Sequence, residues 1–180
     1  MASELSYNQK IVLEKFGKQS VIEMRQAVKT KKISNFRKDA VNASGKLDRS
    51  IEYRLVADGL EIWVNEYAYY VIYGRKPGKQ PPYDPIRDWI DEKGIVPEEG
   101  NTEEDKDSLA WAIVKSIAKE GNTIFRTFAG EDSGLFSEVF DEQTLIELEE
   151  DLQDAIQIEY ESMLDRELSS SPIESGRRFA

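Results

Sequence analysis

The chain has 180 residues, which is enough for one domain with a buried core and short for two full domains. It carries 35 acidic and 24 basic residues, no histidine and no cysteine, so its formal net charge is -11. This charge argues against general affinity for DNA or anionic lipid, and the missing imidazole and thiol exclude catalysis by those groups, disulfides and the zinc sites built from them.

The hydrophobic content predicts a soluble globular protein. Hydrophobic residues make up 39% of the chain, and no apolar run approaches the roughly 18 residues that a membrane-spanning helix needs. Residues 1–10 contain no basic stretch followed by an apolar one, so we expect no secretory signal and a first residence in the cytoplasm.

The charge is unevenly distributed along the chain. Residues 1–83 carry 15 Lys/Arg and 9 Asp/Glu, a net of +6, whereas residues 84–180 carry 9 and 26, a net of -17. The simpler interpretation is that acidic helices keep a small protein soluble. The alternative is head-to-tail association, in which the basic part of one copy meets the acidic part of the next.

The first predicted element is a helix over residues 5–32, or two helices broken near Gly17, because Lys, Glu, Gln and Ala are abundant there. The apolar positions recur at helical spacing: Leu5, Val12, Phe16, Val21, Ile22 and Val28. Residues 42–46 have turn chemistry, with Gly45 able to take a positive φ, and should end this helical region.

The next element is a β-hairpin over about residues 50–65. Apolar and polar residues alternate in both predicted strands, at Ile51, Tyr53 and Leu55 and then at Leu60, Ile62 and Val64. Between them, Asp58-Gly59 fits a tight type I′ turn. A lone hairpin is marginally stable in water, so helices must cover its apolar face.

Residues 65–74 are rich in tyrosine and fit either a third strand or a short helix that ends at Gly74. The basic, proline-containing residues 75–83 should form a stiff exposed loop. Asp84-Pro85 can then cap and begin a short helix over Ile86–Glu92 that stops at Gly94, with Ile86, Trp89 and Ile90 as its buried stripe.

Two further helices complete the predicted fold. Residues 97–107 should be a loop, after which Ser108 can cap a helix that runs through Glu120 and ends at Gly121. A long helix should run from about Phe136 or Asp141 to Leu164. Its acidic residues lie on an outer face, and its apolar positions are Leu145, Leu148, Leu152, Ile156, Tyr160 and Met163/Leu164.

The long helix spans fewer than four heptads with drifting spacing, so we expect it to pack on its own domain or a neighbour rather than form a coiled coil. The fold class is therefore α+β: a small antiparallel sheet built on a β-hairpin and packed by several helices, including a long C-terminal one. We predict a single domain over residues 1–168 and a flexible C-terminal arm over 169–180.

Carboxylates are the one abundant catalytic residue type that remains. Asp84, Asp88, Asp91 and Glu92 cluster around the start of one short predicted helix, and Asp91-Glu92-Lys93 imitates the end of a metal-dependent nuclease motif. Such a site needs its acid and lysine on adjoining strands and an earlier acidic residue well separated from them, so a solvated helix face is the favoured interpretation. No nucleotide-binding glycine loop is present either. We predict no catalytic residue, no metal site and no cofactor.

The tyrosines and the basic loop are the candidate interaction residues. Tyrosines can stack nucleic-acid bases, but binders of single strands combine them with a basic groove, and packing in the core or a subunit interface is favoured here. The basic loop suits a negatively charged protein surface. The proposed interface residues are Tyr67, Tyr69, Tyr70, Tyr73, Arg75, Lys76, Lys79, Tyr83, Arg177 and Arg178.

Short motifs follow one another in a characteristic order over about half of the chain. They are Asn42-Ala43-Ser44-Gly45-Lys46-Leu47 with Ser50-Ile51, Asp58-Gly59, Tyr67-Ala68 with Val71-Ile72-Tyr73-Gly74-Arg75, Pro81-Pro82, Ile86 with Trp89-Ile90, and Ala112-Ile113 with Ile117 and Gly121-Asn122-Thr123. This order resembles the tail-component family of tailed bacteriophages, which comprises head–tail joining and tail-completion proteins. Members usually have an acidic residue before the glycine that Gly74 matches, where this chain has Tyr73.

The resemblance implies a non-enzymatic virion protein that forms a homo-oligomeric ring in the head–tail connector, or neck. Its implied partners are copies of itself, the portal or an adaptor protein, and tail proteins. It would assemble in the host cytoplasm and reside in the neck, where genomic DNA passes without specific binding. Two other functions stay open: a monomeric soluble protein-binding module that uses residues 67–83, and a carboxylate–metal nuclease.

Overall fold

The computed structural model describes residues 4–31, 33, 45–98 and 100–170. Within these residues the elements, in chain order, are α1 (Tyr7–Thr30), α2 (Lys46–Ser50), β1 (Glu52–Val56), β2 (Gly59–Trp63), α3 (Tyr67–Ile72), α4 (Tyr83–Glu92), α5 (Glu103–Glu120), α6 (Thr123–Phe128) and α7 (Glu142–Ser170). The predicted α+β class, with a two-stranded antiparallel sheet and a long C-terminal helix, is confirmed.

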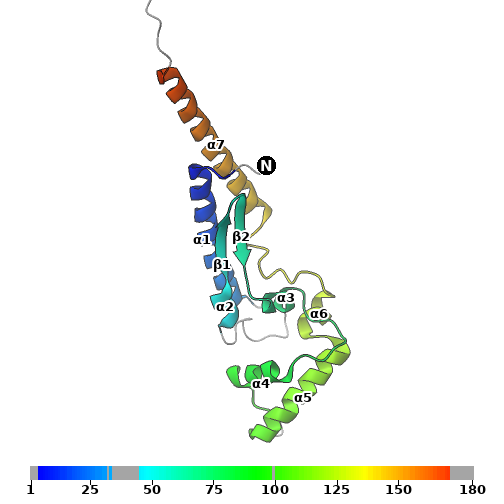
Figure 1. The fold of residues 1–180 in the computed structure, drawn as a ribbon. Coiled ribbons are helices and arrows are strands. Elements are labelled where there is room, and N and C mark those ends of the chain that lie inside the picture. Colours follow the sequence, from blue (N-terminus) through cyan, green and yellow to red (C-terminus); the bar gives the residue numbers. More distant parts are fainter. Residues whose placement is uncertain (1–3, 32, 34–44, 99, 171–180) are drawn as a thin grey trace, which may run out of the picture.

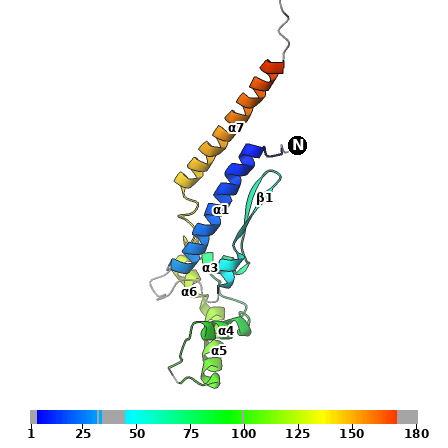
Figure 2. The same ribbon diagram turned by 90° about the vertical axis from the view of Figure 1, so that its left-hand side faces the viewer.

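The molecule is elongated (Figure 1). Helix α1 lies along the β-hairpin, and α2, α3 and α6 gather near the end of that layer. The α4–α5 helix pair lies beyond them at one end of the molecule, and α7 projects from the other end (Figure 2). No helix in the described part of the chain has the length and apolar character needed to cross a bilayer.

Helix α1 is continuous, so the predicted break near Gly17 is wrong. Gly17 is buried where α1 packs on the hairpin, and a Cβ there would lie 2.7 Å from Tyr53 Cδ2 and 2.9 Å from Leu60 Cδ1. A glycine inside a helix costs about 1 kcal/mol relative to alanine, and this close approach offsets the cost. A capping box between Ser6 and Gln9 fixes the start of the helix.

The hairpin is present, but its turn differs from the prediction. Val56 pairs with Gly59, so Ala57 and Asp58 form the two-residue turn. Neither these two residues nor Gly59 has a positive φ, which rules out the predicted type I′ turn centred on Asp58-Gly59. The apolar face packs on α1 through Tyr53 and Leu60, whereas Leu55, which the alternating pattern placed on the same face, is 37% exposed.

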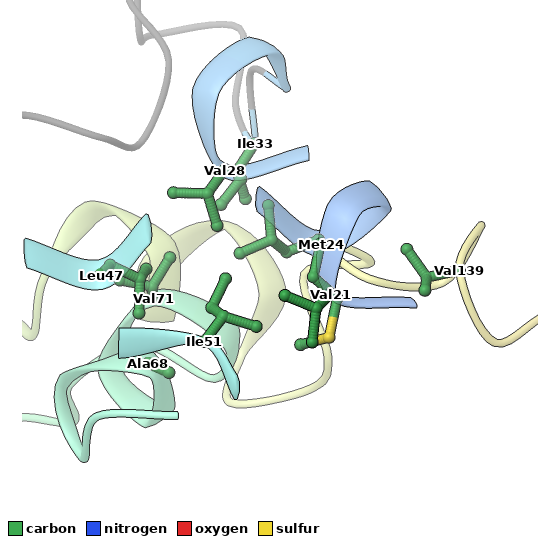
Figure 3. Close-up of a cluster of buried hydrophobic side chains, with 10 residues drawn as sticks. Val21, Met24, Val28, Ile33, Leu47, Ile51, Ala68, Val71 and Val139 are labelled. Atoms are coloured by element: carbon green, nitrogen blue, oxygen red, sulfur yellow. The ribbon is translucent and has the colours of Figure 1, made fainter. Parts of the chain in front are cut away.

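The main core lies where α1, α2, β1, α3 and the segment before α7 meet. It contains Val21, Met24, Val28, Ile33, Leu47, Ile51, Ala68, Val71, Leu135 and Val139, which Figure 3 draws as sticks with all but Leu135 labelled. Ile51 and Val28 are fully buried at its centre. The core therefore joins segments from positions 21 to 139, and it fixes the base of α3 beside α1.

Two short helices, α2 and α3, lie before and after the hairpin in the chain. The tyrosine-rich segment forms α3, and Gly74 follows it at φ 76°, as expected for a glycine that ends a helix. Gly45 has the predicted positive φ, 73°, and it is the N-cap of α2; the first helix already ends at Thr30, and residues 42–44 of the predicted turn lie outside the described residues. Helix α2 has five residues, which is too short to show helical periodicity.

Helices α4 and α5 begin earlier than predicted. Helix α4 starts at Tyr83, so Pro85 lies inside its first turn rather than at its first position. Helix α5 starts at Glu103, because Thr102 and Asp105 form a capping box, and Ser108 therefore lies within the helix. The predicted stops at Gly94 (φ 60°) and Gly121 (φ 81°) are confirmed.

The C-terminal helix α7 begins after Asp141, whose carboxylate accepts a hydrogen bond from Thr144 N at 2.8 Å. It runs to Ser170 instead of Leu164, so the first two residues of the predicted arm, 169 and 170, are helical. The residues added beyond Leu164 include the helix formers Arg166, Glu167 and Leu168. The remainder of the predicted arm lies outside the described residues.

Candidate interaction surfaces

Six of the predicted interface residues lie together around an open groove of about 450 Å³. They are Tyr69, Tyr70, Tyr73, Arg75, Lys76 and Lys79; Gly74, Pro77, Phe125 and Gly130 complete the lining. We call this the tyrosine groove. It lies where α3 and its following loop meet α6, beside the core but open to solvent.

The close approach of α6 to the end of α3 shapes the groove. A Cβ on Gly74 would lie 2.2 Å from Phe125 N and 2.8 Å from Phe125 Cβ, so only glycine lets the two segments come together here. Asn122 caps α6 by accepting a hydrogen bond from Phe125 N at 2.9 Å, and the same side-chain oxygen accepts one from Arg75 N at 2.9 Å. One asparagine thus ties the start of the basic loop to α6.

The basic loop is held to the end of α5 by backbone hydrogen bonds. Asn122 N donates to Arg75 O at 2.9 Å, and Gly78 N donates to Ala118 O at 2.8 Å. A Cβ on Gly121 would lie 2.8 Å from Arg75 O, so the stop of α5 also requires glycine for this contact. The loop that was predicted to be stiff and exposed is exposed at residues 76–80 and is anchored at Arg75 and Gly78.

The walls of the tyrosine groove combine aromatic rings with cations. The Tyr69 ring meets Tyr70 edge to face at 5.8 Å and Tyr73 at 5.0 Å between centroids. The Arg75 guanidinium lies over the Tyr70 ring at 5.4 Å and donates to Lys79 O at 3.2 Å. Such an arrangement fits a ligand that offers apolar side chains and carboxylates together.

The other predicted interface residues lie elsewhere. Tyr67 is exposed on α3 but does not line the groove. Tyr83 belongs to the α4–α5 pair, where it stacks on Trp111 at 4.9 Å and its hydroxyl donates to Asp107 Oδ1 at 2.7 Å. Arg177 and Arg178 lie outside the described residues.

One member of the acidic cluster on α4, Asp91, takes part in an ion-pair network between α4 and α5. Arg87, whose side chain is only 13% exposed, pairs with Asp91, Glu103 and Asp107. Lys106 Nζ lies 3.0 Å from Asp91 Oδ1 and 3.2 Å from Glu103 Oε1. The hydrogen bond from Lys106 lowers the pKa of Asp91 below its usual value, as the one from Tyr83 does for Asp107.

Ion pairs with neighbouring helices engage the two acidic residues of the segment that imitates a nuclease motif. Both oxygens of Asp91 face cations, and Glu92 lies 3.7 Å from Lys46 Nζ. Among the residues that the structure describes, no group of three or more Asp or Glu is arranged to hold a metal ion. Of the acidic residues clustered in the sequence, Asp91 therefore joins α4 to α5 and Glu92 pairs with α2.

A second exposed surface lies on α7. Its first half packs against α1, with Ala155 buried, and its C-terminal half extends past the first turn of α1 (Figures 1 and 2). Large apolar side chains there are exposed: Ile156 by 51%, Tyr160 by 63%, Met163 by 55% and Leu168 by 75%. We call residues 156–170 the distal half of α7.

Helix α7 is also strongly acidic. Its 29 residues include ten Asp or Glu and one Arg, a net charge of -9. The first half meets the basic helix α1, where Lys15 Nζ lies 3.6 Å from Asp151 Oδ2. The distal half carries Glu161, Asp165 and Glu167 beside its exposed apolar residues. It therefore presents apolar and acidic groups together.

The sequence signals found part of these surfaces. The tyrosines and the basic loop are adjacent along the chain, so their clustering could be predicted, whereas Phe125 and Gly130 join the groove only through the fold. The periodicity of α7 identified its apolar positions but not which of them would be exposed.

Comparison with protein-family models, curated proteins and solved structures finds no match to this chain.

Proposed function

We propose that this protein is a structural component of the head–tail connector of a tailed bacteriophage, where copies assemble into a ring between the portal or an adaptor protein and the tail. The phage family in this proposal comes from the resemblance in motif order over residues 42–123. Self-assembly and docking are its activity, and no catalytic step belongs to it. The protein assembles in the host cytoplasm and then resides in the neck of the virion.

The observation that carries the proposal is the pairing of two exposed surfaces of opposite character. The tyrosine groove is aromatic and bears three cations, whereas the distal half of α7 is apolar and acidic. The helices that carry these surfaces, α3 and α6 for the groove and the C-terminal part of α7 for the other, lie well apart on the elongated molecule (Figures 1 and 2). Repeated association through two separated surfaces produces a ring when the rotation between copies closes, which is what a connector needs.

The overall charge suits a channel for DNA. Backbone affinity for DNA comes from cations that neutralise phosphates, and this chain has an excess of 11 acidic charges. A ring whose inner wall carries α7 would let genomic DNA pass without specific binding. An image reconstruction of the neck that places α7 on the outer wall would contradict this part of the proposal.

The proposal is tested on virions. Mass spectrometry of particles purified from the genome that encodes the chain should detect it in a fixed ratio to the portal protein. Gold-labelled antibodies should mark the neck. Deletion of its gene should give separate filled heads and tails, restored by the gene supplied in trans. Particles that lack the protein, or joined particles after the deletion, would refute the connector function.

A monomeric binding module is the second candidate, since the tyrosine groove by itself can receive a segment of another protein. It predicts a chain that stays monomeric at high concentration and is absent from virions, with a partner captured through Tyr69 and Tyr73. Light scattering at several concentrations separates these outcomes from self-association.

A further inference from the structure

We infer that the distal half of α7 from one copy docks in the tyrosine groove of a neighbouring copy, so that the chain associates head to tail. This inference rests on the proposed function, because it assigns the two surfaces through which the ring would form. It commits to a second copy of this chain as the occupant of the groove.

The first reason is that no other element in the described part of the chain covers the distal half of α7. It extends away from the body along the axis of a single helix, while α3 and α6, the helices whose residues line the tyrosine groove, lie toward the opposite end of the molecule (Figures 1 and 2). All described side chains from 160 to 169 are exposed. A helix of 29 residues cannot bend back to its own groove, so any contact between the two surfaces must join two molecules.

The second reason is charge complementarity. Lys76 and Lys79 at the groove make no ion pair with any residue that the structure describes, and Arg75 donates only to backbone carbonyls there. Opposite to them in sign, the distal half of α7 carries Glu161 and Asp165 among its exposed apolar residues. Matching potentials of this kind favour one orientation of encounter and suppress others.

The same charge argument excludes two other surfaces of a second copy as binding sites for the distal half of α7. Pairing of α7 with α7 would bring two helices of net charge -9 side by side. The outer face of α1 also exposes apolar residues, but its cations are already neutralised within the chain: Lys15 by Asp151, Lys18 by Glu14 and Lys10 by Glu4. The tyrosine groove keeps its cations available.

The contact between α1 and the first half of α7 shows how such docking works within one chain. There the apolar stripe of α7 is covered at Ala155 while an acidic neighbour meets a lysine. One to two turns later, the distal half again places apolar residues, Tyr160 and Met163, beside a carboxylate, Glu161. We infer that the aromatic rings of the groove cover its apolar residues and that Lys76 and Lys79 meet its carboxylates.

The chain contains no cysteine, so introduced thiols can report the contact without background. Full-length Leu168→Cys, carrying one tag, is mixed with full-length Lys79→Cys, carrying another, and treated with a short bis-maleimide cross-linker. We expect the mixed dimer in at least about tenfold excess over a control mixture of Leu168→Cys with Lys115→Cys, whose thiol lies on the exposed face of α5. A chain bearing both Leu168→Cys and Lys79→Cys should give a ladder of larger species.

Charge reversal checks the orientation of the contact. Lys76→Glu placed in the Lys79→Cys chain should reduce the mixed dimer about tenfold, and Glu161→Lys with Asp165→Lys in the Leu168→Cys chain should restore it. Yields equal to the control mixture would overturn the inference, and so would a dominant Leu168→Cys homodimer or a reversal without effect. Circular dichroism checks that every variant retains the wild-type helix content.

The outcomes separate this inference from the proposed function. A protein found in virions that gives no mixed cross-link is a connector component that uses other surfaces. A specific, charge-dependent cross-link in a protein absent from virions leaves the head-to-tail contact standing and removes the connector function.

Discussion

Replacing Gly74 with alanine tests whether α6 closes the tyrosine groove. The residue has a φ of 76°, and a Cβ there would lie 2.2 Å from Phe125 N, far inside van der Waals contact. The alanine variant must therefore adopt a left-handed conformation at residue 74, which costs about 1–2 kcal/mol of stability. It must also displace the capped first turn of α6, and overpacking of this kind costs about 1–3 kcal/mol.

A matched variant separates these two costs. Gly134 has nearly the same φ, 72°, but a Cβ there would meet nothing closer than Ser137 Oγ at 3.4 Å. Gly134→Ala should thus lose only the conformational part, about 1–2 kcal/mol, while Gly74→Ala should lose about 2–5 kcal/mol in total.

The free energies of unfolding are measured by urea denaturation followed by far-ultraviolet circular dichroism. The difference between the two variants, about 1–3 kcal/mol, is the cost of pushing α6 away from Gly74. Equal losses, within about 0.5 kcal/mol, would show that the backbone of α6 does not approach Gly74 and that the groove has another shape.

Three further predictions concern the α4–α5 pair and the distal half of α7. Asp91 and Asp107 have pKa values below their usual 3.8 in the folded protein, so their contribution to stability is complete above about pH 4 and is lost as the pH falls through those lowered values. Hydrogen exchange of α4 and α5 should accelerate below that pH more than exchange of α1, and equal acceleration would contradict the network. Thr102→Ala should destabilise the first turn of α5 by about 1 kcal/mol, whereas Ser108→Ala should change its hydrogen exchange little; the reverse order would place the start of α5 at the later residue. Leu168→Ser should leave the unfolding midpoint unchanged while weakening self-association in sedimentation velocity, because that side chain is exposed in the single chain; a lowered midpoint would show that it packs within its own molecule.

Local signals in the sequence predicted those parts of the fold that depend on neighbouring residues. Gly121 and Gly94 marked helix ends because a positive φ at a helix terminus is a property of glycine itself. The start of α5 was missed because two residues could serve as caps, and the reciprocal hydrogen bonds of Thr102 and Asp105 decide between them. Capping geometry thus outweighed the apolar periodicity that favoured Ser108.

Features that depend on distant contacts could not be predicted. The sequence left open whether Gly17 interrupts α1, because the close packing of this glycine against Tyr53, 36 positions later in the chain, cannot be read from neighbouring residues. In the candidate site, the tyrosines and Arg75 are contiguous and were found together. Phe125, which closes the groove, is 50 positions beyond Arg75 and carries no signal of its own.

The distal half of α7 shows why stability and assembly make separate demands on this chain. Side chains that are exposed in the folded molecule gain little from folding, so Tyr160 and Met163 contribute almost nothing to the free energy of unfolding. Helical hydrogen bonds and pairs such as Gln157 with Glu161 hold the helix without them, each pair adding about 0.2–0.5 kcal/mol. In the head-to-tail contact that we infer, these large apolar residues become buried against a second copy, and the carboxylates between them meet its exposed cations.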